Sequence, residues 1–161
     1  MPKIVWLALG YNVPVNPSKN RVYVWRKLKE WGAGYFKQGV AILPKSTKNM
    51  AKFRQLAAKI KELGGEATIA ELKFCDARDE SETVERFRSQ SSSEYDELLR
   101  DCARIVEGVQ KNLFAGGGRE DYKKVMRRYK QAQERDYFFS GTGGKLKAAL
   151  EELAEDIGEL F

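Results

Sequence analysis

Apolar residues follow a mixed pattern in the first half of the chain and a helical pattern in the second. Residues 4–9 form a continuous apolar run, which is typical of a central β-strand covered on both faces. A helix is predicted over residues 17–31, with Asn16 as its N-cap. Residues 35–36 and 40–43 then predict two short strands joined by a tight turn.

A second helix and a fourth strand complete the first half. Ser46 or Thr47 can cap a helix whose apolar residues keep a 3.6-residue period until Gly64-Gly65. Residues 67–74 predict the last strand. The order strand, helix, strand, strand, helix, strand is that of a ferredoxin-like βαββαβ domain, which we assign to residues 1–75 of an α+β protein.

Residues 76–161 have a helical pattern that predicts an appendage of about three helices. The glycine-rich segments Gly116–Gly118 and Gly141–Gly144 separate them, and the serine-rich patch Ser89–Ser93 could interrupt the first. Each helix has an apolar stripe that needs a surface to cover, and the open face of the sheet offers one. We therefore predict a helical extension packed on the βαββαβ domain as one folding unit.

Composition narrows the class of protein. Of the 161 residues, 42% are hydrophobic and 32% charged, which predicts a folded chain rather than a disordered one. The longest apolar run is residues 4–9, whereas a membrane span needs ~20 apolar residues. We expect a soluble, cytoplasmic protein without a membrane partner.

Histidine is absent, and the two cysteines are Cys75 and Cys102. Ser-His-Asp triads, Cys-His dyads and four-ligand zinc sites of cysteine and histidine are therefore excluded. No metal cluster is predicted and no cofactor is expected. Cys102 falls on an apolar stripe, so we expect reduced thiols rather than a disulfide bond.

The net charge of +6 is unevenly distributed. Residues 1–74 hold 14 Lys/Arg against 4 Asp/Glu, a formal charge of +10, whereas residues 75–161 hold 15 against 19, a charge of −4. Such asymmetry indicates either a polyanionic partner or two halves that dock on each other.

The first predicted helix has a basic exposed side. Four cations lie there with Tyr23 among them: Lys19, Arg26, Lys27 and Lys29. Cations beside an aromatic ring suit a phosphate backbone and its bases, and we predict that they contact nucleic acid. A solvated helix face is the alternative.

Arg21 has an unusual predicted position on the same helix. Helical spacing places it between Val24, Trp25 and Leu28, in the middle of the apolar stripe. A guanidinium there must be paired or directed into a cleft. We expect Arg21, beside Asn12, either to bind an oxyanion or to act as a structural clamp. In the structural role its partners would be loop carbonyls or a carboxylate of the helical appendage.

A second basic group lies between residues 119 and 135, and from it we select Arg127 and Arg128 as further phosphate contacts. Like charges at i,i+4 spacing repel, so a phosphate or an acidic surface nearby would be favourable. The acidic residues of the preceding helix could serve equally well, among them Glu94, Glu97 and Asp101. Residues 141–145 superficially suggest a phosphate loop, but no Ser or Thr follows Lys145, so we predict a helix linker.

A series of short motifs extends along nearly the whole chain in a characteristic order. They are Trp6-Leu7, Tyr11, Pro14, Arg21–Leu28, Gly32-Ala33, Gly39-Val40, Leu43-Pro44, Gly64–Ala67, Glu94-Tyr95 and Arg135–Phe138. Their combination resembles the N-terminal domain of the chromate-resistance protein ChrB. The resemblance implies a transcriptional regulator of chromate resistance that binds DNA, often with a separate C-terminal domain, absent from this chain, that could act as a sensor. Chromate is then a possible effector.

The fold more remotely resembles the ferredoxin-like nuclease subunit of CRISPR adaptation complexes and the repressor PaaX. In that nuclease an Asp after the first strand is proposed to hold a metal, and Asn12 takes its place here. A neutral amide is a poorer Mg²⁺ ligand than a carboxylate, which argues against cleavage. The resemblance also implies a possible homodimer.

Three functional hypotheses follow. The leading one is a non-enzymatic DNA-binding regulatory domain. The others are a metal-dependent nuclease, degenerate at Asn12, and a dimerisation module whose basic half docks on its acidic helices.

Overall fold

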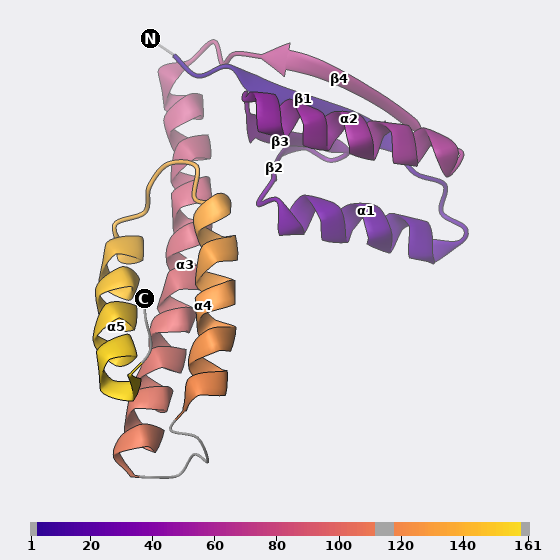
Figure 1. The fold of residues 1–161 in the computed structure, drawn as a ribbon. Helices are drawn as coiled ribbons and strands as arrows, with labels where there is room; N and C mark the ends of the chain where they lie inside the picture. The colour runs from indigo at the N-terminus through magenta and orange to yellow at the C-terminus, as the bar shows by residue number, and fades with distance from the viewer. Residues whose placement is uncertain (1–2, 112–117, 159–161) are drawn as a thin grey trace. The chain divides into compact units, whose positions relative to one another are not determined.

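The computed structural model describes residues 3–111 and 118–158, and the chain forms two compact units, Met1–Thr83 and Val84–Phe161. The first unit is an α+β sheet structure and the second is helical (Figure 1). The division falls inside helix α3 (Ala77–Gln110), a few residues after the change of pattern at residue 75. The start of α3 is tied to the first unit, since the Glu80 carboxylate accepts the backbone N–H of Ile4 at 2.8 Å.

The first unit contains the four strands that the sequence predicts. These are β1 (Trp6–Asn12), β2 (Gly34–Lys37), β3 (Val40–Pro44) and β4 (Glu66–Leu72). They form one antiparallel sheet in the order β2-β3-β1-β4, so β1 is paired on both edges. With two helices between them, the elements follow the predicted order βαββαβ.

The apolar run has its predicted role in β1. Leu7 and Leu9 point to one face of the sheet and Trp6 and Ala8 to the other, and all four side chains are buried. The ring of Phe74, just beyond β4, lies edge-on to Trp6 at a centroid distance of 6.0 Å. Because both sets are covered, a continuous apolar run replaces the usual alternation.

Helices α1 (Ser18–Glu30) and α2 (Thr47–Glu62) pack beside each other, and α2 also packs on β1 and β4 (Figure 1). Ser46 caps α2 as predicted, its hydroxyl accepting the backbone N–H of Asn49 at 3.0 Å. The predicted start of α1 is one residue early. Its N-cap is Pro17 rather than Asn16, because Pro17 still has extended backbone angles, and no side chain caps this end.

In its described residues, the second unit consists of α3 from Val84 onward and two shorter helices, α4 (Arg119–Glu134) and α5 (Thr142–Ile157). Their apolar stripes form a core with one another, so each stripe finds its surface within this unit. The largest contributors are Tyr95, Leu98, Tyr122, Tyr129, Leu146, Leu150 and Leu153. From the sequence alone, the predicted surface for these stripes is the open face of the sheet. Docking of the helical unit on the sheet stays a prediction.

The serine-rich patch does not interrupt α3, which is continuous from Ala77 to Gln110. Its small side chains contact the α4–α5 connection instead, since the Ser92 hydroxyl lies 2.7 Å from that of Ser140 and 3.0 Å from that of Thr142. Of the predicted glycine separators, Gly118 is the N-cap of α4, while Gly116 and Gly117 lie outside the described residues.

The cysteines are free thiols, as predicted, with Cys75 exposed and Cys102 buried. In the described parts of the chain, no helix is sufficiently long and apolar to cross a membrane.

Candidate nucleic-acid interface and the Arg21 cleft

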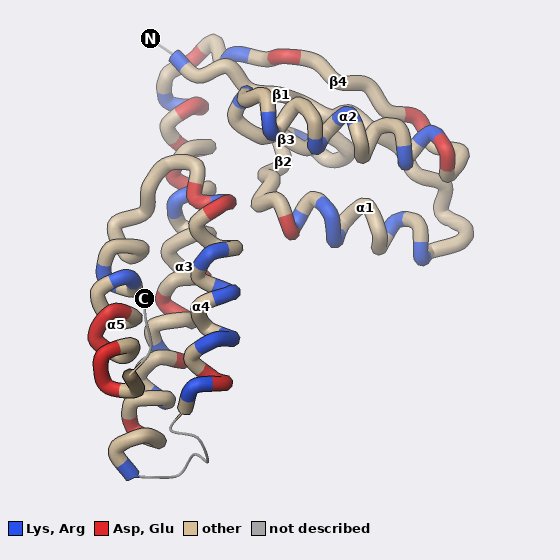
Figure 2. The backbone as a smooth tube through the Cα atoms, in the orientation of Figure 1, with Lys and Arg blue, Asp and Glu red and all other residues tan. Residues whose placement is uncertain are grey.

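Helix α1 presents a basic outer side, as the sequence predicts. Val24 and Leu28 are its buried residues, and its first turn has no acidic residue. Figure 2 shows cations along the length of α1 and an acidic position only at its end. Lys19 and Arg26 are exposed and have no ion pair within the described ranges.

The other two cations of this surface have weak local partners. Lys27 Nζ lies 3.6 Å from Glu30 Oε2, but both side chains are substantially exposed, so the pair exchanges readily with water or another anion. Lys29 Nζ lies 4.9 Å from the ring centroid of Trp25, a cation–π contact. All four predicted cations of α1 therefore remain accessible to a polyanion.

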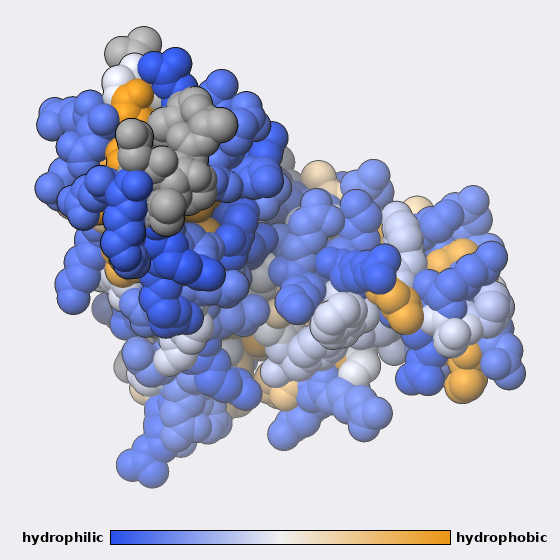
Figure 3. Space-filling view, turned by 90° about the horizontal axis from the view of Figure 1, so that it is seen from below, coloured by the Kyte–Doolittle hydropathy of each residue, from blue (hydrophilic) through white to orange (hydrophobic). Residues whose placement is uncertain are grey.

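Large apolar and aromatic side chains are interleaved with these cations. Tyr23 is 40% exposed and Trp25 is 51% exposed. Lys59 of α2 approaches the Tyr23 ring at 5.6 Å. From below, Figure 3 shows scattered hydrophobic residues set among hydrophilic ones rather than one continuous apolar patch. Such a surface combines phosphate-binding charge with rings on which bases can stack.

Beside this surface lies a cleft of about 570 Å³ that contains both Arg21 and Asn12. The end of β1, the start of α1 and the β2–β3 turn build it. Its lining is Tyr11, Asn12, Val13, Arg21, Trp25, Tyr35, Gln38 and Gly39. Thus the structure brings the two residues together, as predicted, and directs Arg21 into a cleft rather than into a core.

The expected position of Arg21 within a buried stripe is wrong. Val24 and Leu28 are buried, but Arg21 is exposed and Trp25 half-exposed, because the inner surface of α1 is narrower than the wheel suggested. The guanidinium therefore needs no buried partner. Across the described residues, Arg21 has no hydrogen bond or ion pair to another protein group, so neither a loop carbonyl nor a carboxylate holds it.

Two close backbone approaches shape this cleft. Gly39 has a φ of +76°, and the backbone N–H of Tyr11 donates to its carbonyl at 2.8 Å. A Cβ at Gly65 would lie 2.3 Å from the Asn12 carbonyl oxygen. Glycine is therefore required on both sides of the Tyr11-Asn12 segment.

Two tyrosines that line the cleft contact each other. The hydroxyl oxygens of Tyr11 and Tyr35 are 3.2 Å apart and share a hydrogen bond. Burial raises the pKa of Tyr11 above its ordinary value, the bond to Tyr35 raises it further, and Arg21 opposes both. Tyr11 is therefore a neutral phenol at physiological pH.

Among the described residues that line the cleft, none is a carboxylate. The cleft offers one guanidinium, two carboxamides, two phenols and an indole, a set suited to a flat, anionic ligand rather than a cation. Over the described ranges, no group of three or more Asp, Glu, Cys or His residues could hold a metal ion.

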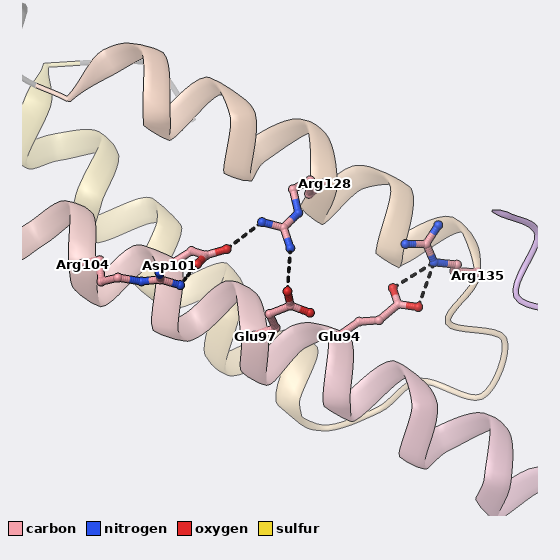
Figure 4. A network of polar contacts seen from close by, with 6 residues as sticks. All are labelled: Glu94, Glu97, Asp101, Arg104, Arg128 and Arg135. Atoms are coloured by element: carbon pink, nitrogen blue, oxygen red, sulfur yellow. Dashed lines mark hydrogen bonds and ion pairs between the residues drawn. The ribbon is translucent and has the colours of Figure 1, made fainter. Parts of the chain in front are cut away.

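The two arginines predicted as phosphate contacts in the second basic group, Arg127 and Arg128, have different surroundings. The Arg128 guanidinium lies 2.6 Å from Asp101 Oδ2 and 3.4 Å from Glu97 Oε1, and Asp101 also pairs with Arg104 (Figure 4). The acidic surface of α3 thus relieves the charge of Arg128, which confirms the internal alternative for this residue. Arg127 is exposed.

Further along the same helix pair, Arg135 Nε donates to both carboxylate oxygens of Glu94 at 2.8 and 3.0 Å (Figure 4). The prediction of a helix linker over residues 141–145 is wrong for all but Gly141, which is the N-cap of α5, because residues 142–145 form the first turn of that helix. Gly143 N–H and Gly144 N–H donate to the carbonyls of Ser140 and Gly141, so these groups are already used in the first turn of α5.

Comparison with known families gives a match over residues 21–160 to the model described as Protein ChrB, N-terminal. This chain belongs to the ChrB N-terminal family. Membership supports a regulatory domain associated with chromate resistance. No curated protein and no solved structure matches the chain.

The ChrB N-terminal match includes Arg21, Trp25, Tyr35 and Gln38 but begins after Asn12. Sequence reasoning missed three of these as cleft residues. The helical pattern places Trp25 in the apolar stripe. Tyr35 and Gln38 fall in a predicted hairpin that is distant in sequence from Tyr11 and Asn12. Antiparallel pairing of β1 with β3 brings that hairpin beside Tyr11.

Proposed function

We propose that this chain is a non-enzymatic DNA-binding regulatory domain of chromate resistance that contacts phosphates through the basic side of α1. The observation that carries the proposal is the basic side of α1, where Lys19, Arg26 and Lys29 are exposed and Lys27 is partly exposed, on a helix whose first turn lacks acidic residues. Family membership supports the regulatory role.

Arg127 belongs to the proposal only as a secondary contact. It is exposed, whereas Arg128 already binds two carboxylates and would have to give them up to reach a phosphate. We expect α1 to supply most of the electrostatic contact, because its cations have weaker partners.

For the first unit we propose a ferredoxin-like classification. The element order βαββαβ and the antiparallel order β2-β3-β1-β4 support it. The nuclease alternative gains no support, since Asn12 is a neutral amide and the described residues around it in the cleft include no carboxylate. Dimerisation and a chromate effector stay predictions.

The test is duplex DNA binding by the full chain across a salt series. We compare it with a double variant, Lys19→Ala with Arg26→Ala, and with a matched control, Lys145→Ala with Lys147→Ala, which removes two exposed cations from α5. Loss of two phosphate contacts should weaken binding and reduce the log–log salt slope by about 2. Unchanged affinity in the α1 variant, or no binding of the parent chain at low salt, overturns the proposal.

A further inference from the structure

The Arg21 cleft is separate in chemistry from the outer cations of α1. A contact with duplex phosphates needs only exposed charge, whereas this cleft combines a guanidinium with an indole, two carboxamides and a pair of phenols. Its volume of about 570 Å³ lies within the ~300–1,000 Å³ typical of small-ligand sites. A duplex backbone alone leaves most of these groups unused.

We infer that the cleft binds a single nucleotide, with its phosphate on Arg21 and its base stacked on Trp25. The ligand is either a free nucleotide or an unpaired nucleotide of a strand, since the two share this chemistry. The inference does not rest on the duplex contact proposed for α1.

The positions of the side chains on α1 favour this arrangement. Arg21, Trp25 and Lys29 are spaced four residues apart and therefore follow one row along the helix. Lys29 already lies over the indole at 4.9 Å, while Arg21 flanks it from the preceding turn inside the cleft. A base on Trp25 therefore has its phosphate within reach of a guanidinium that no protein group holds among the described residues.

The remaining lining groups suit the edge of a base. Asn12 and Gln38 each offer a carboxamide with both a donor and an acceptor, which is the pattern that base edges present in return. The bond between Tyr11 and Tyr35 uses only one of their two hydroxyl protons, so the other hydroxyl can donate to the ligand. None of the described lining residues carries a negative charge that would repel the phosphate.

The experiment titrates the full chain with the four 5′-deoxynucleoside monophosphates, with the matching nucleosides, with inorganic phosphate and with an eight-nucleotide single strand. Calorimetry or tryptophan fluorescence reports binding. We expect a monophosphate or the single strand to bind more tightly than either the nucleoside or phosphate alone, because both halves of the ligand contribute. Equal affinity of monophosphate and strand identifies a free nucleotide, and a clear preference for the strand identifies an unpaired one.

The variants make this result specific. Trp25→Ala should weaken binding about 5- to 150-fold, the range that corresponds to loss of one stacked base. Arg21→Ala should weaken monophosphate binding but leave nucleoside binding unchanged. Arg26→Ala, a control on the same helix outside the cleft, should lower duplex affinity only, so failure of this inference and failure of the duplex proposal are distinguishable. No binding at millimolar ligand, phosphate binding as tight as nucleotide binding, or no effect of Arg21→Ala and Trp25→Ala overturns the inference.

Discussion

The hydroxyl groups of Tyr11 and Tyr35, 3.2 Å apart, join the end of the central strand to the edge strand of the hairpin. The two residues belong to different strands, and both line the cleft that also contains Arg21. It is therefore a structural link and a part of the candidate site at once.

Because of this tyrosine pair, we expect the stability of the fold to decrease at alkaline pH. The pKa of Tyr11 is raised in the folded chain, so folding favours the protonated phenol. Its stabilisation is fully present below the unfolded pKa of ~10 and is lost as pH rises through the higher folded value. Urea unfolding between pH 8 and 11 should show this decline, and Tyr11→Phe should make it shallower. If Tyr11→Phe leaves the profile unchanged, the raised pKa of Tyr11 is contradicted. The other tyrosines with a raised pKa contribute equally to the parent and variant curves.

At neutral pH the same substitution measures the hydrogen bond itself. Tyr11→Phe should lower the free energy of unfolding by about 0.5–1.5 kcal/mol. Adding Tyr35→Phe should cost little more, because the partner of that hydroxyl is already gone. A double-mutant cycle with strictly additive losses would exclude an interaction between the two hydroxyls.

The ion pair between Glu94 and Arg135 should stabilise the helical unit. Their side chains are only 26% and 23% exposed, and Arg135 Nε donates to both carboxylate oxygens. Glu94→Gln should lower the free energy of unfolding by about 1–3 kcal/mol, as expected for hydrogen bonds to charged groups that are partly screened. The control is Glu107→Gln, which breaks an exposed pair with Lys111 and should cost less than about 0.5 kcal/mol. Equal losses would contradict a special role for the Glu94 pair.

Glycine at position 65 is required by a close approach of two backbone segments. In Gly65→Ala the new Cβ would meet the Asn12 carbonyl oxygen at 2.3 Å and Ile60 Cγ2 at 2.9 Å, so the backbone must shift. We expect a loss of about 1–3 kcal/mol in the free energy of unfolding, with a change at the cleft. Gly144→Ala is the matched control, since nothing lies within 4 Å of its Cβ, and helix propensity should make it neutral or stabilising. A neutral Gly65→Ala would show that the segments can separate freely.

The two thiols should differ sharply in reactivity. Burial raises the pKa of Cys102 to about 11, whereas Cys75 is exposed. A thiol reagent at pH 8 should therefore modify one cysteine rapidly in the folded chain and the second only after unfolding. Cys75→Ser should abolish the rapid phase, and a persisting rapid phase would show that Cys102 is accessible.

Much of the local structure and part of the candidate site can be predicted from the order of residues. The apolar run of β1, the Ser46 cap and the basic row of α1 depend on neighbours in sequence, so periodicity and capping chemistry determine them. The proximity of Arg21 and Asn12 could be predicted for the same reason, since only a short connection separates β1 from α1.

Only the tertiary structure decided what those elements face. Strand pairing brings Tyr35 and Gln38 beside Tyr11, and together with Arg21 these residues line a cleft. Packing of α3 against α4 gave Arg128 its carboxylate partners, and the apolar stripes of the three helices formed a core with one another. The physical reason is that a helix wheel or an alternating pattern shows that a side chain needs a partner, while long-range packing selects which partner it meets.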